Sequence, residues 1–302
     1  MLAIVIPFYK FTFFEATLQS LANQTDKRFK VYIGDDASQE NPSGLLEKYR
    51  GKFYFLYHRF QENLGTTSLT KQWERCIELS NTEEWIMILG DDDYMDKNVV
   101  AAFYENLETI NKLEIKVVRF ATRVHEADGS YSKIYNHPKL EKATDFLYRR
   151  FTNATRSSLS EYVFKKTAYK KYGFYNYDLA WFSDDRAWLE ISENKYIYSI
   201  NSALVYFRLS DQNISRNNYK SKEKESIRLM FLKFIISNYL RDFSSEQKRF
   251  FLIYYEQLVY KNNEVNLTFW FFHFCRFTRC LSFIDSLKFT RRVFNYAKNR
   301  TK

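Results

Sequence analysis

The stretch ILGDDDYM, residues 88–95, places three consecutive aspartates directly after a run of apolar residues. That run, WIMIL at residues 85–89, has the length and composition of a buried strand. Three adjacent carboxylates repel one another, and aspartate is among the poorest strand residues. Either a solvated loop or a divalent cation would compensate for such a cluster.

Strands and helices alternate around this run. Further strands are predicted from apolar runs at residues 2–8, 29–36, 53–58 and 114–120. Helical spacing predicts helices at residues 13–23, 42–49, 68–79 and 98–110. The alternation predicts an α/β fold built of βαβ units, with a mainly parallel sheet that helices cover on both faces.

Acidic residues follow two of the predicted strands at the end where open α/β sheets bind ligands. Asp35 and Asp36 end one strand, and Asp91, Asp92 and Asp93 follow another. Aspartate is also a good turn and N-cap residue, and this alternative remains open for either group. Three acids in series favour a metal role, because Mg²⁺ and Mn²⁺ bind carboxylates together with substrate phosphates.

The positive charge of this 302-residue chain is confined to its last third. Residues 1–210 carry 28 basic and 28 acidic side chains, whereas residues 211–302 carry 18 basic and 8 acidic ones. The neutral part is a poor match for nucleic acid, and the basic part indicates a local anionic partner. We therefore expect a catalytic domain at 1–210, a basic, aromatic-rich helical extension at 211–302, and no nucleic-acid partner.

The chain has no recognisable secretory signal and no apolar run long enough to cross a membrane. Its three cysteines are too few and odd in number for a disulfide framework. These features predict a cytoplasmic protein.

Four segments resemble the family 2 nucleotide-sugar glycosyltransferases, which have the GT-A fold, and they occur in the family's order. They are IVIPFYK (4–10), VYIGDDAS (31–38), NLGTTSLTKQW (63–73) and ILGDDDYM (88–95). The last falls where the family has its Asp-x-Asp metal motif. Members often read Asp-x-Asp-Asp there, whereas this chain has Gly90 before its three acids. Two alignments are therefore open: Gly90 replaces the first acid of the motif, or Asp91-Asp92-Asp93 is itself the Asp-x-Asp. Asp93 is an acid in both.

The resemblance implies roles for these residues. Asp93 would bind Mg²⁺ or Mn²⁺, and Asp92 would touch the metal or the ribose, with Asp91 also at the nucleotide sugar. Asp36 would accept the imide N–H of a uracil or thymine ring, or a guanine edge, and a UDP-sugar is the favoured donor. Two further residues, Pro7 and Tyr9, would line the same pocket. Lys71 would lie near the diphosphate, or would simply be a solvated helix lysine.

A second acidic pair occurs in LAWFSDDRAWLEIS, residues 179–192. This segment resembles the acid-acid motif that precedes an apolar helix in the family, and YGFYN before it resembles the acceptor loop. Asp184 would then be the catalytic base of an inverting transfer, and Asp185 is the second candidate for that role. The alternative is that Asp184 caps the helix and that Asp185 interacts with its dipole. Both acids are expected to be exposed at the start of this helix.

The C-terminal residues combine aromatic rings at helical spacing with many basic side chains, most clearly in LTFWFFHFCRFTRCLSFIDSLKF, residues 267–289. An interfacial helix on an anionic membrane carries this combination. A small helical subdomain that packs its rings against the catalytic domain is the alternative, and both interpretations can hold for different faces.

Together these features predict a metal-dependent inverting glycosyltransferase that transfers a sugar from a nucleoside diphosphate to a glycan or lipid-linked acceptor. Cell-surface polysaccharide synthesis at the inner face of the membrane is the expected setting. One alternative is a sugar nucleotidyltransferase, although such enzymes usually have a Gly-rich basic loop where this chain has PFYKFTFF. The other is a non-catalytic membrane- or nucleic-acid-binding module that uses the basic tail.

Overall fold

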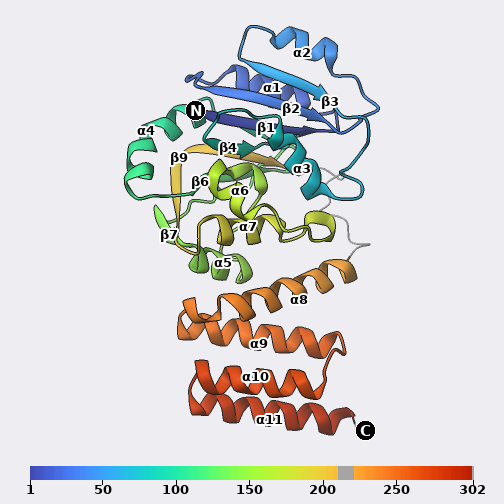
Figure 1. The fold of residues 1–302 in the computed structure, drawn as a ribbon, viewed down its shortest axis with the longest axis vertical. Coiled ribbons are helices and arrows are strands. Elements are labelled where there is room, and N and C mark those ends of the chain that lie inside the picture. The colour runs from blue at the N-terminus through green and yellow to red at the C-terminus, as the bar shows by residue number, and fades with distance from the viewer. Residues whose placement is uncertain (210–220, 301–302) are drawn as a thin grey trace. The chain divides into compact units, whose positions relative to one another are not determined.

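The computed structural model describes residues 1–209 and 221–300 (Figure 1). The chain divides into two compact units, Met1–Lys220 and Ser221–Lys302, and each is described by itself. The boundary at 210/211 between the two predicted domains lies outside the described residues.

Unit 1 is built on a mixed sheet whose strands follow the order β3-β2-β1-β4-β8-β6-β9-β5, while β7 pairs with β9. The strands are β1 (Leu2–Phe8), β2 (Phe29–Asp35), β3 (Phe55–Arg59), β4 (Trp85–Ile88), β5 (Tyr94–Met95), β6 (Val117–His125), β7 (Leu140–Lys142), β8 (Tyr162–Lys165) and β9 (Tyr196–Arg208). β1 to β4 run parallel, as do β6 and β9, whereas β5, β7 and β8 are antiparallel to their neighbours. The predicted α/β fold with a mainly parallel sheet is confirmed.

Helices cover both faces of this sheet (Figure 1). They are α1 (Phe14–Ala22), α2 (Ser43–Tyr49), α3 (Leu69–Glu78), α4 (Val99–Lys112), α5 (Ala143–Phe151), α6 (Lys166–Tyr172) and α7 (Ser183–Ile191), with 3-10 turns η1 (Leu159–Glu161) and η2 (Asp178–Ala180). Alternate residues of β1, including Ile4 and Ile6, face a core shared with α1, α2 and α4. The other face receives α3, close enough that a Cβ on Gly34 of β2 would collide with Cys76. The elements expected up to residue 120 therefore form within a few residues of their predicted bounds.

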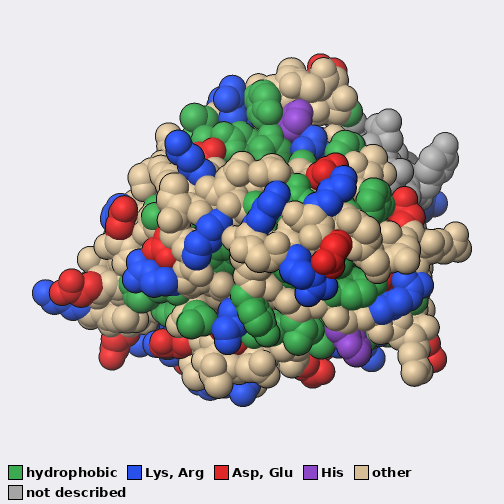
Figure 2. All heavy atoms as spheres, turned by 90° about the horizontal axis from the view of Figure 1, so that it is seen from above, with side chains coloured by type: hydrophobic (Ala, Val, Ile, Leu, Met, Phe, Trp, Pro, Cys, Tyr) green, Lys and Arg blue, Asp and Glu red, His purple; other side chains and the backbone are tan. Residues whose placement is uncertain are grey.

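Charged side chains of both signs are interspersed over the face that Figure 2 shows. That view matches the balanced charge of residues 1–210 and shows no stripe of one sign on this face.

Unit 2 consists of helices α8 (Ser221–Asn238), α9 (Ser245–Lys261), α10 (Leu267–Cys280) and α11 (Phe283–Arg300), with a 3-10 turn η5 (Leu240–Asp242). The helical pattern at residues 267–289 is interrupted at Leu281, whose backbone is extended (φ −131°, ψ −175°). The break is stabilised because the hydroxyl of Ser282 donates to Asp285 (2.6 Å) and accepts its N–H (3.3 Å). In the described ranges of the chain, no helix is long and apolar enough to span a bilayer.

A buried carboxylate and aromatic stacking join three of these helices. Both carboxylate oxygens of Glu256 on α9 accept hydrogen bonds from Arg292 on α11, at 2.8 and 2.7 Å. Phe277 of α10 stacks on Phe289 of α11 with ring centroids 5.0 Å apart. The inner aromatic side chains of unit 2 thus form a core of its own.

Candidate active site

The carboxyl ends of β1, β2 and β4 meet at one edge of the sheet because these strands are parallel and in register. Phe8 pairs with Asp35, and Val5 pairs with Ile88 two residues before Gly90. One carboxylate oxygen of Asp91 accepts the backbone N–H groups of Tyr9 and Lys10, both at 2.7 Å. Asp91 therefore joins the end of β4 to the end of β1.

A cavity of about 470 Å³ opens at this edge. Its lining consists of Pro7, Tyr9, Lys10, Asp36, Asn63, Gly65, Thr66, Thr67, Leu69, Asp91 and Leu179. Four side chains predicted to bind the nucleotide sugar, Pro7, Tyr9, Asp36 and Asp91, thus share one cavity. Lys71 does not line it: this residue is exposed in the first turn of α3, where its N–H binds the capping hydroxyl of Ser68. Lys10 lines the cavity and was not identified from the sequence.

Asp36 is held in the cavity wall by the turn that precedes α3. Its two oxygens accept the N–H groups of Leu64 (2.7 Å) and Gly65 (2.9 Å), and it forms an ion pair with Arg75. A Cβ on Gly65 would lie 2.6 Å from one of these oxygens, so the turn needs glycine at this position. The Asn-x-Gly segment and the acid after β2 thus form one structural unit.

Asp93 is buried and oriented from two directions. Its Oδ2 accepts a hydrogen bond from the hydroxyl of Ser160 (2.5 Å), and its Oδ1 accepts one from the backbone N–H of Arg208 (2.9 Å). Burial, reinforced by repulsion from Asp92, raises the pKa of Asp93 to about 8 and that of Asp91 to about 7. A cation bound at the triplet would therefore offset both the burial of these carboxylates and the repulsion between them.

The carboxylates of Asp92 and Asp93 both lie close to Gly90. A Cβ at this glycine would lie 3.0 Å from Oδ2 of Asp93 and 3.1 Å from Oδ1 of Asp92, so both oxygens face the position that a side chain would fill. In the portions of the chain that the structure describes, no three His, Cys, Asp or Glu side chains are grouped to hold a metal. The protein would supply only part of the coordination shell, as it commonly does for Mg²⁺ and Mn²⁺ when a phosphate supplies the rest. The crowding also gives a physical reason for glycine at position 90.

A second cavity, of about 360 Å³, lies beside the first and shares Leu69 and Leu179 with it. Asp184 and Asp185 line it, together with Trp73, Trp181, Phe182, Arg150 and Arg156 among others. The structure thus brings the second acidic pair next to the cavity that contains Asp91, although about ninety residues separate them in sequence.

The two acids of this pair differ in exposure. Asp184 is half-buried and Asp185 is only 3 % exposed, so the expectation that both are exposed is wrong for Asp185. Oδ2 of Asp185 lies 3.7 Å from Nε of Arg150, whose charge compensates part of its burial. Burial and the neighbouring Asp185 raise the pKa of Asp184 to about 7. The cap position of α7 is Phe182, which makes no side-chain cap, so Asp184 is not the N-cap.

The backbone before α7 is strained. Leu179, Ala180 and Phe182 all have left-handed φ values of 52–65°, which cost side chains other than glycine free energy. The ring of Phe182 stacks on Phe151 at 5.6 Å with an interplanar angle of 4°, and such packing holds the segment in place. Strain of this kind concentrates at functional sites, and Leu179 contributes to both cavities.

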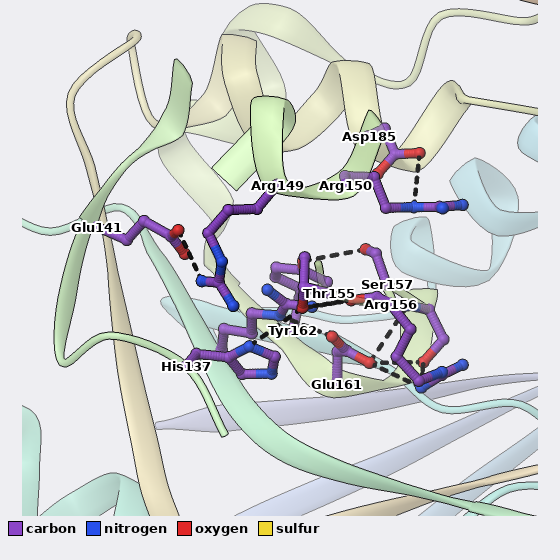
Figure 3. A network of polar contacts seen from close by, with 12 residues as sticks. His137, Glu141, Arg149, Arg150, Thr155, Arg156, Ser157, Glu161, Tyr162 and Asp185 are labelled. Atoms are coloured by element: carbon purple, nitrogen blue, oxygen red, sulfur yellow. Dashed lines mark hydrogen bonds and ion pairs between the residues drawn. The ribbon is translucent and has the colours of Figure 1, made fainter. Parts of the chain in front are cut away.

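Figure 3 shows a buried network of polar contacts around Glu161, with Asp185 and Arg150 nearby. Glu161 accepts hydrogen bonds from Nε of Arg119 (2.7 Å), Nη1 of Arg156 (3.2 Å), and the N–H (3.2 Å) and hydroxyl (2.9 Å) of Ser158. These contacts fix η1, from which the adjacent Ser160 binds Asp93. Sequence reasoning did not find these residues: Ser158 and Glu161 form a capping box that is a local signal, whereas Arg119 lies on a separate element.

The network continues toward β7 and α5. Arg149 binds Glu141 at 2.7 Å, and the hydroxyl of Thr155 lies 3.5 Å from Nδ1 of His137 (Figure 3). Burial and the charge of Arg119 lower the pKa of His137 to about 2, so its ring is neutral. Its neutral ring adds no further positive charge to a region already rich in arginine.

The sequence matches the model of the family described as Glycosyl transferase family 2 over residues 3–176. No curated protein matches the chain. Among solved structures, S. aureus TarS 1-349 in complex with UDP-GlcNAc superposes with a TM-score of 0.64 at 15% identity, covering 89% of this chain and 77% of that one. TarS 1-349 in complex with UDP gives 0.61 at 16% identity, covering 89% and 76%. At identities this low, the superpositions show that the fold is shared.

Proposed function

The chain belongs to glycosyl transferase family 2, and we propose that it is a metal-dependent, inverting enzyme that transfers a sugar from a UDP-sugar to an acceptor hydroxyl. The observation that carries the proposal is the pair of adjoining cavities. One contains the acids that follow β2 and β4, the other contains Asp184 and Asp185, and Leu69 and Leu179 line both. Family membership decides against a nucleotidyltransferase and against a non-catalytic binding module.

The donor would occupy the first cavity. Tyr9 and Pro7 would border the base, and Asp36, already fixed by the turn before α3, would present its remaining acceptor capacity to the uracil imide. The structures of S. aureus TarS with UDP-GlcNAc and with UDP support a UDP-sugar as donor. Lys71 was the predicted diphosphate contact, but Lys10 lines the cavity and is the better candidate.

Asp92 and Asp93 would hold Mg²⁺ or Mn²⁺ through the two oxygens that face Gly90. The ion, when bound, would neutralise charge on the departing diphosphate. Ser160 and the backbone of Arg208 would keep Asp93 in position for this role, and Asp91 would hold the end of β1 beside it.

Asp184 is proposed as the base because it is the more accessible acid of its pair and lines the second cavity. Its carboxylate would take the proton of the acceptor hydroxyl. The new bond to the anomeric carbon would form as the bond from that carbon to the diphosphate oxygen breaks, and UDP would leave. Asp185, close to Arg150, would orient Asp184 rather than take the proton.

The acceptor is proposed to be a glycan or a lipid-linked glycan, in cell-surface polysaccharide synthesis. An enzyme with such an acceptor would work in the cytoplasm, against the inner face of the membrane. The helices of unit 2 would carry the surface for that contact.

Calorimetric titration of UDP, GDP, dTDP and CDP, with Mn²⁺ and then with EDTA, tests the donor assignment. Binding of UDP alone that disappears with EDTA supports it, and so does its loss in Asp93→Ala. An exposed acid in a turn, Asp128, provides the matched control: Asp128→Ala should bind UDP as the native chain does. Absence of binding by any of the four nucleotides in the presence of metal would refute the donor site.

A further inference from the structure

The outer sides of α10 and α11 expose large apolar side chains. Leu267, Phe271 and Phe274 follow one face of α10, and Phe283, Leu287 and Phe294 follow one face of α11. These six side chains, here called the aromatic face, are between 43 and 86% exposed. Single exposed apolar residues are ordinary on a protein surface, but a group of this size marks an interaction site.

The opposite sides of the same helices are well packed. Phe277 and Phe289 are 1% and 2% exposed, and Trp270 contacts Tyr296 with ring centroids 6.0 Å apart. The inner rings therefore form the core of unit 2, and the aromatic face is additional to that core. The inner rings pack within unit 2 itself, and membrane contact stays a prediction for the outer side of the helices.

The exposed charged side chains of α10 and α11 have one sign. Asp285 is the one acidic residue within α10 and α11, and its carboxylate is buried and bound by Arg249 through two hydrogen bonds of 2.9 Å. Arg279, Lys288 and Arg291 are exposed on the same two helices. Exposed rings beside basic side chains suit a partner that is apolar inside and anionic at its surface.

We propose that the aromatic face docks on an anionic lipid leaflet, with its rings at the level of the acyl boundary and Arg279, Lys288 and Arg291 at the lipid phosphates. A second copy of the chain is a poorer occupant. Symmetric pairing of this face would oppose positive charges on both copies, and α10 and α11 expose no acidic side chain to neutralise them. The contact would be peripheral, because no described helix can span a bilayer.

Sedimentation of the full chain with vesicles tests the proposal. Phosphatidylcholine vesicles that also contain phosphatidylglycerol should bind the chain, whereas pure phosphatidylcholine should bind it weakly. The double variant Phe271→Ser, Phe274→Ser should lower the affinity at least about tenfold. Met230→Ser, at another exposed apolar residue of unit 2, should leave it unchanged.

A matched pair of triple variants tests the contribution of the basic side chains to vesicle binding. Reversal of Arg279, Lys288 and Arg291 to glutamate should lower affinity for anionic vesicles by at least about 100-fold. The same reversal at three other exposed basic residues of unit 2 should lower that affinity far less; these are Lys222, Lys233 and Arg241. Equal losses in the two triple variants, or equal binding to both kinds of vesicle, would overturn the proposal.

Light scattering separates lipid docking from self-association. A dimer of the native chain that dissociates in Phe271→Ser, Phe274→Ser would assign the face to a second copy and overturn the proposal. UDP titration without vesicles should be the same for the native chain and all these variants. Failure of membrane docking and failure of the donor assignment are therefore distinguishable.

Discussion

Replacement of Glu161 by glutamine should destabilise unit 1 strongly. The carboxylate accepts four hydrogen bonds, two of them from the guanidinium groups of Arg119 and Arg156. Glutamine keeps one acceptor oxygen and turns an NH₂ group toward donors. Arg119, whose side chain is 1% exposed, would then remain buried without its counter-charge.

Breaking a buried pair by removing one partner costs about 3–5 kcal/mol. This is a large share of the roughly 5–15 kcal/mol by which a folded protein is stable. With a urea m-value of about 2–3 kcal/mol/M for a unit of this size, the midpoint should fall by about 1–2.5 M.

Glu193→Gln is the matched control. Glu193 also contacts two basic side chains, Lys116 and Lys171, but at the surface, where such pairs contribute about 1 kcal/mol or less. Urea unfolding followed by tryptophan fluorescence reports mainly on unit 1, since four of the five tryptophans lie there. Equal midpoint shifts in Glu161→Gln and Glu193→Gln would refute the reasoning.

Four further predictions concern the two cavities and the proposed metal site. Gly65→Ala should weaken UDP binding about 10–100-fold in calorimetry, because the added Cβ displaces the Asp36 carboxylate, whereas Gly44→Ala, with open space around it, should have no effect. Asp184→Asn should lower turnover about 10²–10⁴-fold with donor affinity unchanged, and a loss below tenfold would count against Asp184 as the base. Turnover of the native enzyme should rise with pH through about 7, because only the ionised carboxylate accepts a proton; a profile that falls over this range would contradict the assignment. EDTA should abolish transfer and added Mn²⁺ should restore it, whereas full activity in EDTA would exclude the metal role of Asp93.

The sequence by itself determined the α/β core and the edge of the sheet where the acids meet. Apolar runs of strand length alternate with helical spacing, and parallel strands necessarily bring their carboxyl ends together. The sequence alone therefore assigns Asp36 and Asp91 to one edge of the sheet. Both depend on local patterns and on one general rule of sheet geometry.

Only the tertiary structure decided how these acids are held. Arg119 and Glu161 are 42 positions apart on separate elements, and no local pattern pairs them. The same is true of the contact between Ser160 and Asp93. Burial of Asp185 depends on the packing of α7 against its neighbours rather than on its own neighbours in sequence. Local periodicity specifies helices and strands, whereas burial and ion pairing depend on which distant segments meet.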